Sequence, residues 1–228
     1  MIVLRKQSTV DGELKMSTAE QRDHHSPESY LDTEELSPEK NEFVNGYLRA
    51  MSGATVRHNQ VAGNSHGLLW SNLNRSKCKA FTSDMKIRIR RGSMTWFYYP
   101  DASVVCESNR PSEVYQDKPV LVIEILSRST RSVDLDEKLS NYLGIDTLQM
   151  YLILEQDRAD AVAYRRTNAI SPGDLFVREC YQGLAAKIEL PFLGFEICLS
   201  DIYSGVEFPA APVRELEPDY RVDLVSEP

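Results

Sequence analysis

Residues 119–126, Pro-Val-Leu-Val-Ile-Glu-Ile-Leu, restrict the fold more than any other part of the sequence. A nearly continuous run of aliphatic residues is typical of a central strand that is covered on both faces of its sheet. Glu124 interrupts this run, although an ionised carboxylate is costly to remove from water unless it is paired or bound to a cation. We therefore expect a covered sheet that carries a carboxylate for a chemical reason.

The chain has 228 residues, of which 42% are hydrophobic, so one domain can bury a core without metals or disulfides. We expect a globular domain over residues 30–208. Residues 1–29 are polar and lack a sustained apolar period, which predicts a flexible N-terminal extension. Residues 209–228 are rich in prolines and acids and predict an extended acidic tail.

The cysteines and the apolar runs indicate the cellular location of the protein. No pair of cysteines has CxxC spacing, so we expect free thiols in a reducing cytoplasm. No apolar run reaches the roughly 18 residues of a membrane helix, and the N-terminus lacks a signal-peptide pattern. A cytoplasmic location without a membrane partner is therefore expected. The four cysteines are Cys78, Cys106, Cys180 and Cys198.

The order of periodic segments predicts an α/β (α+β) fold, in which helices flank a mixed sheet. Ser37-Pro38 and the acids after it predict a short N-terminal helix over residues 39–42, followed by a hairpin that turns at Asn45-Gly46. Amphipathic helices are expected over residues 56–73 and 134–144, the second ending at Gly144. Strands are expected over residues 84–90, 96–106, 119–126, 150–156, 161–166, 175–180 and 187–190.

A second acid, Asp101, interrupts the strand-like segment that precedes the central strand. Two carboxylates about 4 to 5 Å apart on adjacent strands would repel by roughly 3 to 4 kcal/mol at an effective dielectric near 20. A divalent cation between them would turn this repulsion into affinity, and hard carboxylate oxygens select Mg²⁺ or Mn²⁺ over Zn²⁺. The alternative is that Glu124 pairs with Arg128 while Asp101 caps a turn, and spacing alone does not separate the two.

A cation that could act on a phosphate is missing from the central strand itself. Leu126, two residues after Glu124, lies on the same strand face and has no charge. Lys138, about one turn after Leu135 on the next helix, could lean over the strand end toward Glu124. The alternative is that Lys138 extends into solvent, as most lysines at a helix border do.

The overall charge of −8 argues against a nucleic-acid partner, but the local charge favours one. Residues 75–91 contain seven basic residues and one acid, Asp84. Strict alternation over residues 84–90 places Arg88 and Arg90 on the outer face of a half-buried strand. His58 and His66 lie eight residues apart on a helix, too far for a shared zinc, so a nucleic-acid-facing surface is the better interpretation.

Five segments together resemble a known family. The combination resembles the Uma family of restriction-endonuclease-like proteins, also called domain of unknown function 820, over residues 30–208. That resemblance implies a PD-(D/E)XK nuclease fold with a metal-dependent phosphodiesterase site. The segments are Glu42-Phe-Val-Asn-Gly, Thr82-Ser-Asp-Met-Lys-Ile-Arg-Ile, Tyr99-Pro-Asp-Ala-Ser-Val-Val-Cys, Val122-Ile-Glu-Ile-Leu-Ser-Arg-Ser-Thr and Asp136-Glu-Lys-Leu.

The resemblance also implies residue roles. Asp101, Glu124 and the main-chain carbonyl of Ile125 would bind Mg²⁺, with Mn²⁺ as a substitute. Lys138, supplied by the following helix in place of the usual strand lysine, would orient the attacking water and offset charge on the phosphate. Glu42, the acid of the N-terminal helix, would hold a further metal or its water. Asp84 matches a family position and is assigned a structural or DNA-contacting role beside Arg88.

The main hypothesis is a Mg²⁺-dependent endonuclease that hydrolyses phosphodiester bonds of DNA. The second is a catalytically inactive nucleic-acid-binding protein on the same fold, and the third is an interaction domain indifferent to both Mg²⁺ and DNA. No GxSxG elbow, GxxxxGK[ST] loop or GxGxxG turn supports another enzyme class. A homodimer is one option for the assembly, because nucleases of this superfamily often dimerise to cut both strands.

Overall fold

A computed structural model describes residues 24–127, 129–168 and 175–209. The helices are α1 (Pro27–Leu36), α2 (Val56–Asn72), α3 (Arg131–Val133), the π-helix η1 (Asp134–Lys138), α4 (Leu139–Leu143) and α5 (Leu199–Ile202). The strands are β1 (Asn41–Val44), β2 (Tyr47–Ala50), β3 (Lys79–Thr82), β4 (Lys86–Arg91), β5 (Met94–Tyr98), β6 (Ala102–Val105), β7 (Tyr115–Gln116), β8 (Pro119–Leu126), β9 (Met150–Glu155), β10 (Asp160–Arg166), β11 (Phe176–Gln182), β12 (Lys187–Leu190) and β13 (Phe195–Cys198).

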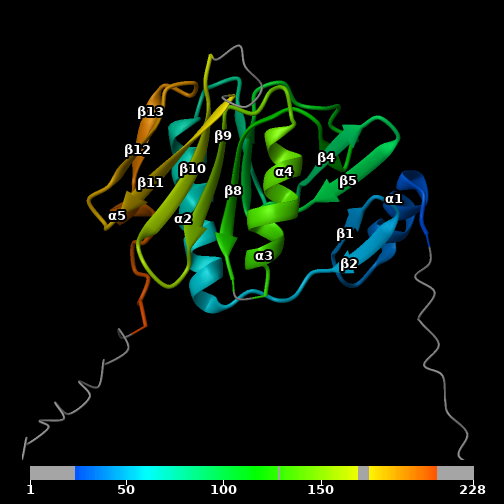
Figure 1. The fold of residues 1–228 in the computed structure, drawn as a ribbon, viewed down its shortest axis with the longest axis horizontal. Coiled ribbons are helices and arrows are strands. Elements are labelled where there is room, and N and C mark those ends of the chain that lie inside the picture. Colours follow the sequence, from blue (N-terminus) through cyan, green and yellow to red (C-terminus); the bar gives the residue numbers. More distant parts are fainter. Residues whose placement is uncertain (1–23, 128, 169–174, 210–228) are drawn as a thin grey trace, which may run out of the picture.

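The strands form two mixed sheets and a separate hairpin of β12 and β13 (Figure 1). The larger sheet has the order β11-β10-β9-β8-β6-β3, and the smaller one has the order β2-β1-β5-β4-β7. Strand β8 lies inside the larger sheet, parallel to β9 and antiparallel to β6. The predicted mixed sheet flanked by helices is confirmed, with its strands divided between two sheets.

Helices cover both faces of the larger sheet. Helix α2 packs Val61 and Leu69 into the cluster that holds Ile123 of β8. Consecutive helices α3, η1 and α4 form one segment on the opposite side, drawn in front of β8 in Figure 1. Tyr142 of α4 clusters with Val122 of β8 and also with residues of β4 and β5, so this segment lies between the two sheets.

The alternation of strand β8 decides which way Glu124 faces. Leu121, Ile123 and Ile125 belong to the cluster that contains α2, whereas Val122 and Leu126 belong to the cluster that contains α4. Successive strand residues point to opposite faces. Glu124 therefore faces the helical segment of residues 131–143.

Several local predictions match the structure. The hairpin turns at Asn45 (φ 46°) and Gly46 (φ 103°), both in the left-handed region that this turn requires. The predicted helix over residues 56–73 is α2, whose first turn is capped by the Thr55 hydroxyl, which accepts from the main-chain N–H of His58. Gly144 ends α4 as expected.

Two element predictions are wrong. The N-terminal helix spans Pro27–Leu36 rather than residues 39–42, and Glu42 lies on strand β1. Its true start signal is Ser26, whose side chain accepts from the N–H of Ser29 ahead of a first-turn proline. The strand predicted over residues 96–106 is two strands in different sheets, because Pro100 has no N–H with which to continue a ladder.

Other predictions lie mostly outside what the structure describes. The extension over residues 1–29 and the tail over residues 209–228 fall largely outside the described residues and stay predictions, although α1 already begins at Pro27. Within the described ranges, none of the helices combines the length and the apolar character that crossing a membrane requires.

The prediction of four free thiols is wrong for two of them, because a disulfide joins Cys78 and Cys106. Strands β3 and β6 pair antiparallel with Lys79 opposite Val105, so the next facing positions of the ladder are these two cysteines. Spacing along the chain does not reveal this pair, because strand register brings the two cysteines together. Cys180 and Cys198 are free. A cytoplasmic location stays a prediction, and disulfides are rare in that compartment.

Reduction of this disulfide should destabilise the fold. It closes a loop between residues 28 positions apart, and chain entropy assigns a loop of this size about 3.6 kcal/mol. We expect dithiothreitol to lower the urea midpoint of the parent protein, and to leave unchanged that of a Cys78→Ser, Cys106→Ser double variant. A parent midpoint that does not respond to the reductant would contradict the disulfide.

Candidate active site

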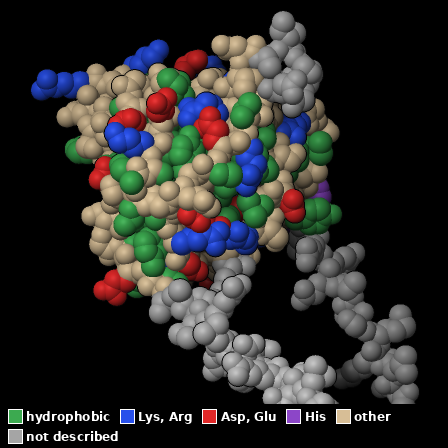
Figure 2. All heavy atoms as spheres, turned by 60° about the vertical axis from the view of Figure 1, so that its left-hand side comes forward, with side chains coloured by type: hydrophobic (Ala, Val, Ile, Leu, Met, Phe, Trp, Pro, Cys, Tyr) green, Lys and Arg blue, Asp and Glu red, His purple; other side chains and the backbone are tan. Residues whose placement is uncertain are grey.

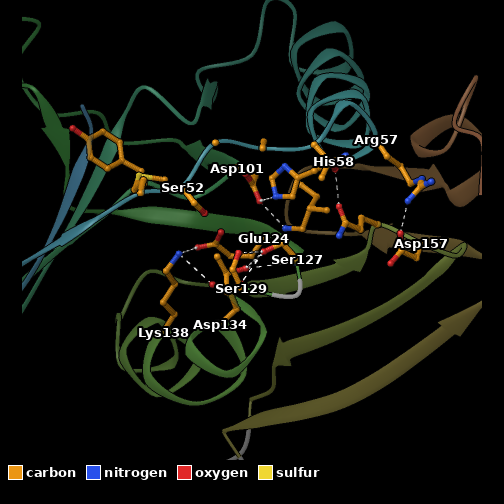
Figure 3. Close-up of a pocket in the computed structure, with 18 residues that line it drawn as sticks. Ser52, Arg57, His58, Asp101, Glu124, Ser127, Ser129, Asp134, Lys138 and Asp157 are labelled. Carbon is orange, nitrogen blue, oxygen red and sulfur yellow. Dashed lines mark hydrogen bonds and ion pairs between the residues drawn. The ribbon is translucent and has the colours of Figure 1, made fainter. Parts of the chain in front are cut away.

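A pocket of about 460 Å³ lies between the N-terminal end of α2 and the helical segment of residues 131–143 (Figure 3). It opens at the carboxyl end of β8 and the start of β6. Five predicted site residues line it, together with Asp134, which the sequence analysis did not single out. The five are His58, Asp101, Glu124, Ile125 and Lys138.

Strand register brings the two acids together. Ala102 of β6 lies opposite Ile123 of β8, so Asp101, the residue before β6, lies beside the carboxyl end of β8 that carries Glu124. Both acids line the same pocket. The Asp101 Oδ2 atom accepts a hydrogen bond of 2.7 Å from the main-chain N–H of Ile125, which anchors this carboxylate beside β8.

Lys138 is buried at the centre of the site instead of extending into solvent. Its Nζ atom lies 3.0 Å from Glu124 Oε1 and 3.0 Å from Glu42 Oε1. A third carboxylate, that of Asp134, lies 3.2 Å away. The side chains of all four residues are at most 6% exposed. The helix that follows β8 therefore supplies a cation to the central carboxylate, as Figure 3 shows.

Glu42 reaches the site from β1, in the smaller sheet. Its Oε2 atom accepts from Arg49, with an Nη2 distance of 2.7 Å. Arg49 is the facing residue of the hairpin, and it also binds Glu137 on η1 at 3.0 and 3.1 Å. The Tyr98 hydroxyl donates to the same Glu137 carboxylate at 2.8 Å. Glu42 thus pairs with two cations, Lys138 and Arg49.

Three of these residues were not identified as site residues from the sequence, although the sequence contained a signal for two of them. Arg49 could have been found by extending the register of the Asn45-Gly46 turn, which places it opposite Glu42. Asp134 precedes Lys138 by four residues, a spacing at which side chains meet on a helix. Glu137 is a neighbour of Lys138 and carries no signal of its own.

Carboxylates outnumber cations in and around the pocket. Lys138, Arg49 and Arg57 are the permanent cations, and His58 is a fourth when protonated. The excess of negative charge is costly away from water and would be relieved by an added cation. The six carboxylates are those of Glu42, Asp101, Glu124, Asp134, Glu137 and Asp157.

Burial is the main reason that the pKa of Glu124 lies well above its usual range, and the charges of Asp134, Asp101 and Glu42 raise it further against the opposing effect of Lys138. Burial also raises the pKa of Asp134. For Lys138, burial alone would lower the pKa, but the three carboxylates outweigh it and raise the pKa well above its usual range. Without an added cation, burial and like charges therefore make the ionised form of Glu124 costly, while Lys138 is held charged.

The donor set fits a hard divalent ion rather than zinc. Across residues 24–127, 129–168 and 175–209, no group of three His, Cys, Asp or Glu side chains is arranged to hold a metal. Mg²⁺ does not require one, because it is usually bound by one or two carboxylates and keeps several waters. Asp101, Glu124 and the Ile125 carbonyl offer such a partial set, and the surplus of buried carboxylates supplies the charge.

His58 contacts the Asp101 carboxylate, one of the proposed metal ligands. Its Nε2 atom is 3.4 Å from Asp101 Oδ2. Burial would lower the pKa of His58, but hydrogen bonds to the Asp101 carboxylate and to the Ile125 main chain outweigh burial and raise it. The His58 ring thus occupies the side of Asp101 that faces α2, where the carboxylate favours its protonated form.

The other residues predicted to contact DNA lie elsewhere. Arg88 binds Asp117 at 2.7 Å and, with Arg90, lines a separate pocket. Asp84 is exposed and pairs with Lys40. Arg128, the alternative partner of Glu124, lies outside the described residues. On the face drawn in Figure 2, Lys and Arg side chains are interspersed with acidic and hydrophobic ones.

Comparison with known proteins matches residues 27–196 to the Uma2 family model, described as putative restriction endonuclease. Uncharacterized proteins slr1290 and sll1609 of Synechocystis sp. are 31% identical over 184 residues and 32% identical over 130 residues. The matches cover 80% and 56% of this chain, and 93% and 72% of those proteins.

A solved structure has a similar fold. The crystal structure of a putative nuclease belonging to DUF820 from Anabaena variabilis has a TM-score of 0.60 at 17% identity, over 78% of this chain and 96% of that one. The predicted family resemblance and nuclease-like fold are confirmed by these matches.

The raised pKa of Glu124 makes a prediction for the metal-free protein. The folded chain keeps a proton that the unfolded chain releases above the ordinary Glu value of 4.5, so the free energy of unfolding should fall as the pH rises from there. Glu124→Gln removes this titration, so its free energy of unfolding should decline less steeply with pH. The decline that remains comes from Asp134, whose pKa is raised in the same direction. Urea unfolding in EDTA at a series of pH values measures the free energy of unfolding.

The matched control is Glu189→Gln, which changes an exposed glutamate on β12. It should follow the parent at every pH. Equal slopes for Glu124→Gln and the parent would show that Glu124 does not hold a proton in the folded state.

Proposed function

The chain belongs to the Uma2 family, described as putative restriction endonucleases, and we propose that it is a divalent-metal-dependent endonuclease that hydrolyses phosphodiester bonds of DNA. Family membership supports a nuclease. The metal, the DNA substrate and the residue roles are the proposal. The observation that carries it is that Asp101 and Glu124 line one pocket, in which Lys138 contacts Glu124.

We assign Mg²⁺ to Asp101, Glu124 and the main-chain carbonyl of Ile125, with Mn²⁺ as a substitute. A bound divalent ion would polarise the scissile phosphate and lower the pKa of a water. The anionic excess of the site supports this assignment, because a doubly charged ion would stabilise Glu124 as a carboxylate. To accept it, Asp101 exchanges its contact with His58, and Glu124 shares its contact with Lys138.

Lys138 is the residue that we assign to the phosphate and its attacking water. Its ammonium lies at the wall of the pocket and is held charged by surrounding carboxylates. A cation fixed in a water-poor site stabilises developing negative charge more than a mobile one does, since it need not reorganise. Glu42 was expected to hold a second ion or a water. Its pairs with Lys138 and Arg49 favour holding the lysine in place.

DNA is the proposed partner because the family is described as restriction endonucleases. His58, which lines the pocket beside Asp101, remains assigned to the substrate side of the site. The internal pair of Arg88 with Asp117 leaves less of its charge for phosphates. A homodimer, in which two sites would cut both strands, and a cytoplasmic location remain parts of the proposal.

A plasmid-nicking assay with Mg²⁺ or Mn²⁺ tests this function. The parent should nick supercoiled DNA and lose the activity in EDTA. Glu124→Gln should lower the rate on the order of 10²-fold or more, because it removes a carboxylate that binds the ion. Lys138→Ala should be as inactive. This change leaves Glu124 and Asp134 buried without a cation, so the folded fraction of the variant is measured by circular dichroism.

Matched controls are Glu189→Gln and Lys187→Ala, both exposed on β12. They should cut as the parent does. A Glu124→Gln variant that cuts at the parental rate would refute the site. A parent that binds DNA but never cuts it with either metal would support the inactive nucleic-acid-binding alternative.

A further inference from the structure

We propose that Asp134 is a positioning residue of this site, which holds the Lys138 ammonium in place when Glu124 binds the metal. The inference rests on the proposed function and deepens it, because it gives a role to a buried carboxylate that neither the motif nor the family description assigns. Asp134 is 2% exposed, lines the pocket, and lies 3.2 Å from Lys138 Nζ.

The π-helix places the two residues together. Asp134 is the first residue of η1 and Lys138 is the last, so both side chains project into the site from one wide turn. Single π turns within helices occur frequently at functional sites. The main chain of Asp134 is anchored, because its carbonyl accepts from the Tyr151 hydroxyl of β9 at 3.1 Å. The main chain that carries the carboxylate is thus tied to the sheet independently of Lys138.

The other partners of Lys138 have competing commitments. Glu42 also binds Arg49, and Glu124 is the carboxylate that the proposed ion would share. Within the described parts of the chain, Lys138 is the one cation that forms an ion pair with Asp134. When the ion draws charge from Glu124, Glu42 and Asp134 are left to hold the ammonium over the pocket, and Glu42 shares its charge with Arg49. Without Asp134, Lys138 would lose its fixed position. The rate of the chemical step depends on that position more than substrate binding does.

The test compares Asp134→Asn with Asp136→Asn, an exposed aspartate on the same π turn. Calorimetry measures Mn²⁺ affinity, and steady-state nicking at saturating Mn²⁺ measures kcat and KM. We expect Asp134→Asn to lower kcat about 10- to 100-fold, as loss of a supporting partner does, while the dissociation constant for Mn²⁺ and KM change less than about twofold. Asp136→Asn should match the parent in all three.

Other outcomes overturn the inference in distinct ways. If Asp134→Asn cuts like the parent, Asp134 does not position Lys138. If it loses Mn²⁺ affinity as Glu124→Gln does, Asp134 is a metal ligand instead. If the parent itself never cuts, the proposed function fails and this role fails with it. Should Asp134→Asn not fold, Asp134→Glu, which keeps the charge but moves it by one methylene, is judged by the same criteria.

Discussion

The buried ammonium of Lys138 is the interaction on which the rest of the site depends. It joins Glu42 of the smaller sheet, Glu124 of the larger sheet and Asp134 of the helix between them. Losing the cation of such a cluster typically costs about 3 to 5 kcal/mol, because Glu124 and Asp134 then stay buried and unpaired. One side chain therefore links the arrangement of the two sheets to the electrostatics of the pocket. The same ammonium group stabilises the fold and serves the proposed chemistry.

The surplus of carboxylates explains why the site is both costly and useful. The apolar clusters on the two faces of β8 hold Glu124 away from water, which raises its pKa. A hydrophobic residue at this position would pack well and cost less. Groups whose pKa is displaced by burial and by like charges gather at functional sites more often than elsewhere. The cost at Glu124 is thus consistent with a site that is complete only when a cation arrives.

Much of this site could be predicted from sequence, because strand periodicity carries the information. The aliphatic run around Glu124 identified the central strand, and Asp101 stood in the strand beside it. The spacing of four residues could have paired Asp134 with Lys138, but nothing in the sequence marks the π turn that carries both. The break at Pro100 and the disulfide depend on which strands pair, and pairing across tens of residues is decided by tertiary packing.

The central claim is that Asp101 and Glu124 share one divalent ion. Anomalous scattering from a crystal grown with Mn²⁺ tests it most directly, because it locates the ion without reference to activity. The account predicts one strong peak, within roughly 2.0 to 2.3 Å of a carboxylate oxygen of each residue. No peak at saturating Mn²⁺, or a peak bound by other residues while Glu124 still contacts only Lys138, would contradict it.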